Sequence, residues 1–430
     1  MEMFSYYLKL SVRNLQRNWL FFSLMTLTLA VGVGVLLANV TILKSMANDP
    51  IPQKSSRVFS VNLSTWPNSP SNHEQPMHIM RHSDARHILA SDIPTHKMVH
   101  YQSWVYTRDI NSTSLARVGA SVRATTPGFF GLTDAPFAYG GSWTQANAQE
   151  VVIGEDLNQQ LYHGANSVGN NIEIDGKPFT IVGVLKKWNL KPLFYHATEQ
   201  QAFNKTDDIF APIETALTNE WGINARSSST QSFSSPSDTR GKDVFYIQAF
   251  VQLDTKQQQD NFQNYLDSYS QSLKDAGQHP LDINNKLFDV NTWLKRNEVV
   301  DQRIVAFALA TVLFLTVCVF NASSLLLARY HGAKFETALR RAVGASRREI
   351  FYQGTVESLI IGIVCAALAM ILGWVFLKLS INVFPHLEDV AQIDGEMLVI
   401  GVTIALLTTF ISALYPLLRA CSIKVLTDLK

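Results

Sequence analysis

The sequence predicts an α-helical membrane protein with four transmembrane helices, one plus three, and a large mixed α+β extracytoplasmic domain inserted between helices one and two. The first observation is that the chain holds four long apolar runs, at residues 19–43, 304–327, 355–379 and 397–418. Each run is long enough to cross a hydrocarbon core of about 30 Å as a helix. The second observation is that residues 44–303 are polar and interrupted by turn residues, as in a soluble domain.

The distribution of charge predicts the orientation of the four helices. Basic residues gather in segments 1–18, 328–354 and 419–430, whereas the loop at 380–396 is acidic and has no Lys or Arg. Positive residues mark the cytoplasmic side of a membrane protein. We therefore expect the three basic segments inside, and the 44–303 domain and the acidic loop outside. The first run is longer than the apolar core of a cleaved signal peptide, about 7–15 residues, which predicts an uncleaved anchor.

Local patterns predict the elements of the outer domain. Runs rich in β-formers predict strands, and polar runs with helical spacing predict helices. Strands are expected at residues 57–63, 150–153 and 244–253, and helices at 155–162 and 255–276. Residues 171–185 predict a hairpin, because Asp175–Gly176 accepts the positive φ of a tight turn. Helix two is expected to continue outward as a stalk over residues 287–303.

Two segments of the outer domain have unusual composition. Residues 219–241 are rich in Ser, Thr and Asn and predict a mobile outer loop, either a tolerated insertion or a loop for a substrate or partner. Six histidines crowd one segment: His73, His78, His82, His87, His96 and His100. His78 and His82 could share a helix face as a metal pair, but without Cys or an HExxH pattern scattered surface histidines are favoured. A role in pH response stays open.

The chain carries no sequence pattern for catalysis or nucleotide binding. It has no GxxxxGK[ST], GxSxG, HExxH or CxxC. We therefore expect no catalytic residue, cofactor or metal site in this chain. The net charge of +1 gives no general attraction to nucleic acid. Cys318, Cys365 and Cys421 lie outside the 44–303 domain, which must fold without a disulfide.

The connector at 328–354 has the most regular charge pattern. Apolar residues recur in it at helical spacing: Ala338, Leu339, Ala342 and Val343. Glu336 and Arg340 are spaced to pair at i, i+4, and Gly344 can end one helix or allow a bend into the next. A short amphipathic helix tipped with cations results. Its charge alone is explained equally by an anchor on anionic lipid and by a contact with another protein.

The segment LRRAVGASRREI, with Glu336 before it and Glu357 after it, closely resembles the connector of MacB/FtsX-type (type VII) ABC transporter permeases. The resemblance continues in other segments: 8–24, 321–329 and 415–430 resemble membrane parts of these permeases, and 126–130, 151–157, 168–185 and 208–216 resemble a MacB-like periplasmic core domain. The chain departs from the family at Phe335, where a basic residue is usual, and at Lys424–Val425, which replaces Asp-Pro. It also lacks the ATPase domain that MacB itself carries.

This resemblance implies a permease subunit of an ABC transporter in a bacterial inner membrane, itself not an enzyme. Its partners would be a separate ABC ATPase subunit that binds ATP and Mg, a second permease chain (identical or related), a periplasmic adaptor and a TolC-like outer-membrane channel. ATP hydrolysis inside would move the periplasmic domain (mechanotransmission) and drive efflux of peptides, toxins or antibiotics. The alternatives are a lipoprotein-releasing permease, and signalling that regulates a periplasmic cell-wall hydrolase.

The resemblance also implies which residues couple the chain to its ATPase. All lie in the connector: Lys334, Glu336, Arg340, Arg341, Gly344, Ala345, Ser346, Arg347 and Arg348. The second permease chain is expected to pair through helices one and two. Gly32, Gly34 and Ala38 of the first helix are small residues of the kind that let membrane helices approach closely.

Overall fold

The structure is a computed structural model that describes residues 2–66, 76–112, 115–188, 190–198, 201–278, 283–383 and 393–422. The chain divides into two compact units. Residues 1–47 and 300–430 form the membrane unit, and residues 48–299 form the head. The membrane unit therefore joins segments from both ends of the sequence.

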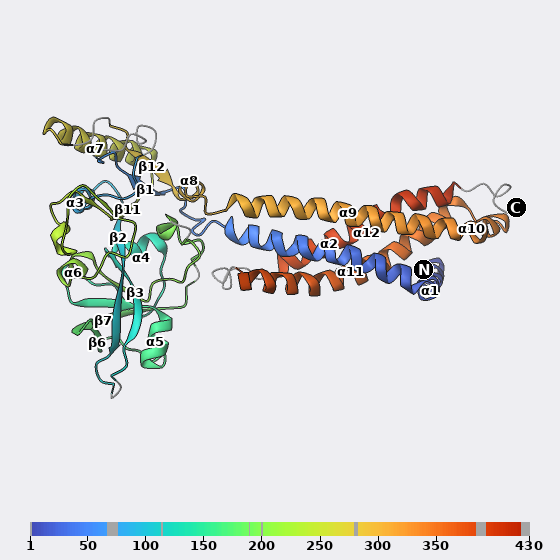
Figure 1. The fold of residues 1–430 in the computed structure, drawn as a ribbon, viewed down its shortest axis with the longest axis horizontal. Helices are drawn as coiled ribbons and strands as arrows, with labels where there is room; N and C mark the ends of the chain where they lie inside the picture. Colours follow the sequence, from blue (N-terminus) through green and yellow to red (C-terminus); the bar gives the residue numbers. More distant parts are fainter. Residues whose placement is uncertain are drawn as a thin grey trace. The chain divides into compact units, whose positions relative to one another are not determined.

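The membrane unit is built from helices. They are α1 (Glu2–Arg17), α2 (Trp19–Met46), α9 (Gln302–Gly332), α10 (Lys334–Ala342), α11 (Arg347–Val383) and α12 (Gly395–Cys421) (Figure 1). Four of them, α2, α9, α11 and α12, are long and apolar enough to cross a membrane. The predicted one-plus-three arrangement is confirmed, and each of the four helices extends past the end of its apolar run.

α2 packs against both α9 and α11. A Cβ added to Gly32 would lie 3.1 Å from Cys318 Sγ of α9, and one added to Gly34 would lie 3.0 Å from Leu372 Cβ of α11. Ala38 is buried as well. Close helix packing at these small residues is thus confirmed, but its partners belong to the same chain. The pairing of two permease chains through helices one and two stays a prediction; within one chain, α9 and α11 contact the two glycine surfaces.

The head is a mixed α+β domain, as predicted. Its strands are β1 (Val58–Asn62), β2 (His96–Asp109), β3 (Val118–Thr125), β4 (Phe137–Gly140), β5 (Glu150–Ile153), β6 (Asn171–Ile174), β7 (Lys177–Leu185), β8 (Ile209–Pro212), β9 (Ser228–Ser229), β10 (Val244–Phe245), β11 (Gln248–Gln252) and β12 (Lys286–Asp289). Its helices are α3 (His82–Ala90), α4 (Gly128–Thr133), α5 (Glu155–Tyr162), α6 (Ile213–Thr218), α7 (Lys256–Asp275) and α8 (Val290–Arg296), with 3₁₀ turns η1 (Phe194–His196) and η3 (Ser237–Thr239).

A ten-stranded sheet organises the head. The strand order is β12-β1-β11-β2-β3-β8-β5-β7-β4, and β6 pairs with β2 and β7. Pairing is parallel between β3 and β8 and between β5 and β7, and antiparallel elsewhere in this sheet. Val99 and Tyr101 of β2 are buried in a hydrophobic core that also receives Ile88 of α3 and Phe262 of α7. The head therefore has a core of its own and needs no disulfide.

Several predicted elements are confirmed. β5 and α5 have the predicted limits, and β1 lies within the predicted strand. The hairpin of β6 and β7 turns at Asp175 and Gly176, with φ of 46° and 84°, as a type I′ turn requires. The helix predicted at 255–276 is α7. It starts with a capping box, because Thr255 Oγ1 accepts from Gln258 N and Gln258 Oε1 accepts from Thr255 N.

The strand predicted at 244–253 is wrong in one respect, because it is divided into β10 and β11. These two strands belong to different sheets. Tyr246 N and Ile247 N, which lie between them, both donate to Met80 O, so the chain leaves one sheet before it enters the other. β10 pairs with β9, which lies within the Ser-rich segment 219–241.

The stalk predicted over 287–303 is also wrong. This segment contains β12 and α8, followed by Glu298 with φ of 49°. Asp301 then caps α9 by accepting a hydrogen bond from Arg303 N. A positive φ and a new N-cap interrupt the helical hydrogen bonds, so helix two begins at Gln302.

Candidate functional site

The connector predicted to carry function forms α10 and the short link to α11. α10 ends in a Schellman motif. Gly344 N donates to Arg341 O, and Ala345 N donates to Arg340 O, both at 3.1 Å. Gly344 has a φ of 113°, which residues with a Cβ rarely adopt. Of the two predicted roles of Gly344, ending a helix is confirmed.

Ser346 starts α11. Its Oγ accepts a hydrogen bond from Glu349 N at 3.3 Å, and Glu349 Oε2 accepts one from Ser346 N at 2.8 Å. This reciprocal pair is a capping box, which the residue order Ser-Arg-Arg-Glu encodes. The first motif ends at Ala345 and the next begins at Ser346. The change of direction between α10 and α11 is therefore set by two consecutive local motifs.

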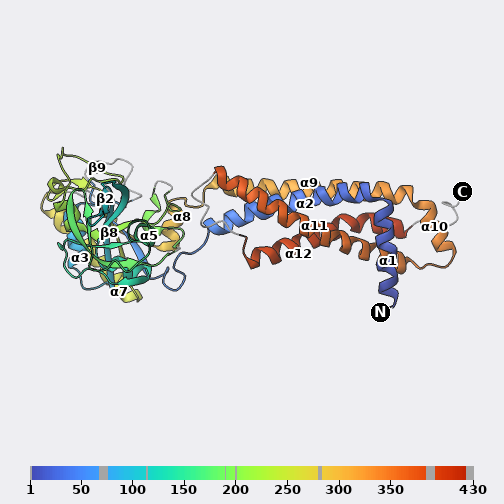
Figure 2. The same cartoon turned by 90° about the horizontal axis from the view of Figure 1, so that it is seen from below.

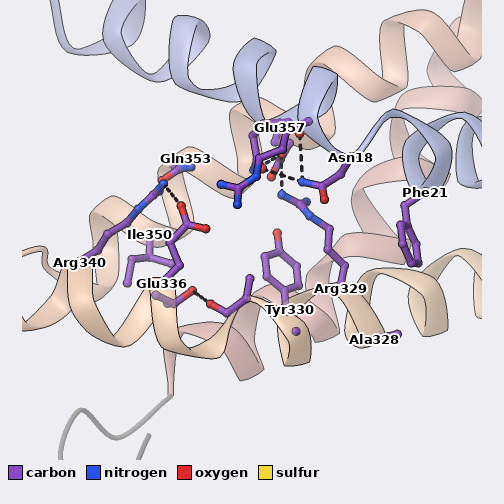
Figure 3. Close-up of a pocket in the computed structure, with 16 residues that line it drawn as sticks. Asn18, Phe21, Ala328, Arg329, Tyr330, Glu336, Arg340, Ile350, Gln353 and Glu357 are labelled. Atoms are coloured by element: carbon purple, nitrogen blue, oxygen red, sulfur yellow. Dashed lines mark hydrogen bonds and ion pairs between the residues drawn. The ribbon is translucent and has the colours of Figure 1, made fainter. Parts of the chain in front are cut away.

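Arg340 connects α10 to α11. Its Nη2 lies 2.7 Å from Glu336 Oε1, which confirms the predicted i, i+4 pair. Its Nη1 donates to Gln353 Oε1 of α11 at 3.1 Å. Figure 3 shows Arg340 extending toward Gln353. Ala338 of α10 is fully buried. One side of α10 is thus held by the rest of the membrane unit.

Another side of α10 carries an exposed apolar stripe. Phe335, Leu339 and Val343 are 60%, 48% and 83% exposed, and their spacing of four residues places them along one face of the helix. Apolar side chains gathered on the surface mark a contact with a protein or a membrane. The i, i+4, i+8 spacing can be read in the sequence. The sequence does not single it out, because Ala338 and Ala342 form a second apolar series with the same spacing, and Ala338 is buried.

The remaining predicted coupling residues lie at the ends of α10. Those of intermediate burial are Lys334, Arg341 and Ala345. The exposed ones surround the link to α11: Gly344, Ser346, Arg347 and Arg348. The connector therefore presents an apolar stripe with guanidinium groups beyond its end.

A cavity of about 390 Å³ lies beside α10 and is lined by residues of α1, α2, α9, α10 and α11 (Figure 3). Arg329 Nη2 and Asn14 Nδ2 both donate to Glu357 Oε1, at 3.1 and 2.8 Å. The Arg329 and Glu357 side chains are only 10% and 5% exposed. This group joins α9, α1 and α11 through a nearly buried ion pair. Arg329 and Asn14 are absent from the predicted coupling set, since their contacts span distant parts of the chain.

α1 is separated from α2 by a break at Asn18 and runs across the direction of the long helices (Figure 2). Asn18 Nδ2 donates to Asn14 O at 3.2 Å. Asn14 in turn binds Glu357 of α11. A helix that lies across a bundle of membrane-length helices is suited to the membrane interface, and the bond from Asn14 to Glu357 ties α1 to α11.

His78 and His82, considered as a possible metal pair on one helix face, are not placed on one helix. His78 precedes α3 and His82 begins it, so the two do not share a helix face. His82 Nε2 lies 2.7 Å from Glu214 Oε1 instead. Among the described residues, no group of three or more His, Cys, Asp or Glu could hold a metal. The predicted surface position is wrong for His82 and His100, because both side chains are buried. His73 lies outside the described residues.

The head contains a second buried ion pair. Arg123 Nε lies 2.9 Å from Asp207 Oδ2, and both side chains are 2% exposed. Arg123 Nη1 lies 3.3 Å from His100 Nδ1. Burial, and then the charge of Arg123, lower the pKa of His100 well below its usual value and lower the pKa of His196 to about 4. Both histidines are therefore neutral at neutral pH.

Two protein families match the chain. Residues 22–269, more than half of it, match the MacB-like periplasmic core domain, and residues 308–425 match the FtsX-like permease C-terminal region. No curated protein matches.

Among solved structures, the periplasmic region of MacB from Actinobacillus actinomycetemcomitans is similar at 13% identity and a TM-score of 0.37, over 59% of this chain and 97% of that one. The extracellular domain of the ABC-type transporter YknZ from Gram-positive bacteria is similar at 10% identity and a TM-score of 0.34, over 54% of this chain and 99% of that one.

Proposed function

The chain belongs to the MacB/FtsX-type ABC transporter permeases, and from this premise we propose that it couples ATP hydrolysis by a separate ATPase subunit to movement of its periplasmic head. It is a multi-pass inner-membrane protein with four membrane-length helices and a large periplasmic domain. ATP and Mg would be bound by the ATPase partner. The role of this chain would be mechanical, and the purified chain alone should not hydrolyse ATP.

The observation that carries the proposal is the two-sided character of α10. Arg340 binds Gln353 of α11 on one side, while Phe335, Leu339 and Val343 are exposed on another. A partner that binds the apolar stripe would therefore displace a helix that is already bonded to α11. Because consecutive cap motifs define the short link between these helices, the displacement would be passed on rather than lost in a loose loop.

The ion pair of Arg329 and Glu357 would extend this displacement to α9. α9 begins at Gln302, and the head ends at Val299. α2 ends at Met46, and the head begins at Asn48. Both covalent connections to the head are thus only a few residues long. Movement of α2 and α9 would reach the head through these short connections.

We propose efflux of peptides, toxins or antibiotics as the work that this movement performs. The pump would include a second permease chain, a periplasmic adaptor and a TolC-like outer-membrane channel. The MacB-like head supports this proposal. The gene neighbourhood distinguishes it from lipoprotein release and hydrolase regulation: adaptor and channel genes beside the permease gene favour efflux, and their absence favours the alternatives.

Charge reversal in the connector tests the coupling. Arg340→Glu, Arg341→Glu and Arg347→Glu together should abolish co-purification of the ATPase and transport-dependent resistance, at normal permease levels. Removing one partner of a desolvated interfacial charge pair costs about 2–5 kcal/mol, whereas a cation near lipid contributes about 1 kcal/mol. If both association and resistance persist, the connector is only a membrane anchor.

Two further variants make this test specific. Arg340 also binds Gln353, so Arg340→Glu would break an internal bond as well as a contact with the ATPase. Arg347→Glu alone tests the contact with the ATPase. Lys9→Glu is the matched control, because Lys9 is an exposed cation of α1 outside the connector. We expect Arg347→Glu to weaken ATPase association and Lys9→Glu to leave it unchanged.

A further inference from the structure

The cavity beside α10 offers hydrogen-bonding groups that the coupling proposal does not use. Among the charged residues that line it, Arg340 is bonded to Glu336. Glu357 accepts its bonds from Arg329 and Asn14. The two acidic groups of the lining are thus engaged by groups of the chain itself, and an occupant would meet the cations and neutral donors that remain.

Arg329 lines this cavity and has one guanidinium nitrogen without a hydrogen-bond partner among the described residues. Its Nη2 binds Glu357, but its Nη1 is buried without a hydrogen-bond partner in the described part of the chain. The side chain is held in place, since its guanidinium carbon lies 4.4 Å from the centre of the Phe22 ring. A buried N–H without an acceptor is costly. The site therefore favours an occupant that supplies an acceptor to the guanidinium of Arg329, which lines the cavity.

The lining selects a negative charge for this occupant. Three arginines, including Arg17, face two glutamates, which leaves one net positive charge. Arg17 is exposed at the end of α1, and Tyr330 adds a hydroxyl. Figure 3 shows the Tyr330 ring beside Arg329, with the hydroxyl directed toward the group around Glu357. Guanidinium forks bind phosphate oxygens with paired hydrogen bonds.

The surroundings favour a phosphate that carries acyl chains. The start of α2 exposes Trp19, Leu20, Phe21 and Leu24, and Phe21 also lines the cavity. Tryptophan at the end of a membrane helix is typical of the headgroup level. We propose that this cavity binds the phosphate of an anionic membrane lipid, with Arg17 and Arg329 as its ligands and the acyl chains against the exposed start of α2.

Native mass spectrometry of the full chain in a mild detergent, titrated with phosphatidylglycerol, tests this site. Arg17→Gln should weaken the tightest lipid association about fivefold or more, the equivalent of about 1 kcal/mol per cation. Tyr330→Phe, which removes one hydroxyl, should also weaken it. Arg13→Gln is the matched control: Arg13 is exposed one turn earlier on α1 and does not line the cavity. It should bind the lipid like the wild type.

Three outcomes would overturn the proposal. Equal loss in Arg13→Gln and Arg17→Gln would show that binding follows the general charge of α1, and no loss in either would show that Arg17 is not a ligand. Arg17-dependent stabilisation by inorganic phosphate, without retention of phosphatidylglycerol, would exclude the lipid as the source of the phosphate. ATPase co-purification is expected to survive Arg17→Gln, so failure of this site is distinguishable from failure of the coupling proposal.

Discussion

Arg329 of α9 and Glu357 of α11 form a nearly buried ion pair, with 3.1 Å between Nη2 and Oε1. Asn14 of α1 donates to the same carboxylate oxygen, and Phe22 of α2 lies under the guanidinium. Four helices thus meet at one charge pair. In the proposed coupling, this junction would pass a displacement of α11 to α9 and α2.

Glu357→Ala should destabilise the membrane unit by about 3–5 kcal/mol, because it leaves Arg329 buried without its counter-charge. The double variant Arg329→Met with Glu357→Leu removes both charges and should recover most of this loss. Thermal unfolding of the purified chain in detergent measures both. Equal destabilisation in the single and double variants would mean that side-chain packing, and not the ion pair, holds the junction.

Gly344→Ala should destabilise the end of α10 by about 1–2 kcal/mol, because a Cβ is unfavourable at positive φ. The cost comes from the backbone alone, since no atom lies within 4 Å of the added Cβ. Gly332→Ala is the matched control: it also has open space, and its φ is not in the left-handed region. Hydrogen exchange of α10 amides should rise in the first variant only. A similar rise in both would contradict the assigned Schellman motif.

The parts of the connector that could be predicted from the sequence depend on local spacing. The pair of Glu336 and Arg340 is four residues apart, and the cap of α11 lies within four consecutive residues from Ser346 to Glu349. Helical geometry alone brings such side chains together. Turn chemistry similarly predicted the hairpin of β6 and β7. These elements need no knowledge of the tertiary fold.

The parts that could not be predicted depend on contacts between distant segments. Asn14 and Glu357 are 343 residues apart, and no local pattern pairs them. Gly32 and Gly34 were correctly assigned to close packing, but small residues on a helix do not specify whether the partner belongs to the same chain. The failed stalk has a comparable cause, because helical spacing over 287–303 does not reveal the breaks at Glu298 and Asp301.

The stability of the head should fall as the pH falls below about 6.5. Burial is the main cause that lowers the pKa of His196 to about 4, and burial lowers that of His100 well below its usual value. Between those values and the ordinary pKa of about 6.5, the unfolded chain binds protons that the folded head excludes, so acid favours unfolding. The stabilisation is complete above about pH 6.5.

Each such histidine should contribute about 1.4 kcal/mol per pH unit in this range. His196→Gln should therefore reduce the pH dependence by that amount, and His163→Asn, at an exposed position, should not. Hydrogen exchange of amides in β2 and β11 of the full chain, measured from pH 7 to pH 5 and corrected for intrinsic exchange, reports the difference. An unchanged slope in His196→Gln would show that its ring is protonated in the folded head.

A substitution in the apolar stripe of α10 distinguishes apolar docking of the ATPase from attraction by charge. Leu339→Ala should weaken binding of the ATPase to the solubilised permease by about 5- to 30-fold, because loss of a buried leucine contact in an interface costs about 1–2 kcal/mol. Leu8→Ala is the matched control, since Leu8 of α1 is 40% exposed and Leu339 is 48% exposed.

The affinities of these variants for the ATPase are compared at low and high salt. Loss of apolar contact should persist at high salt, whereas the effect of Arg347→Glu should shrink as salt screens the charge. Equal weakening by Leu8→Ala would assign the effect to detergent or lipid contact, and normal binding of Leu339→Ala would remove the stripe from the interface.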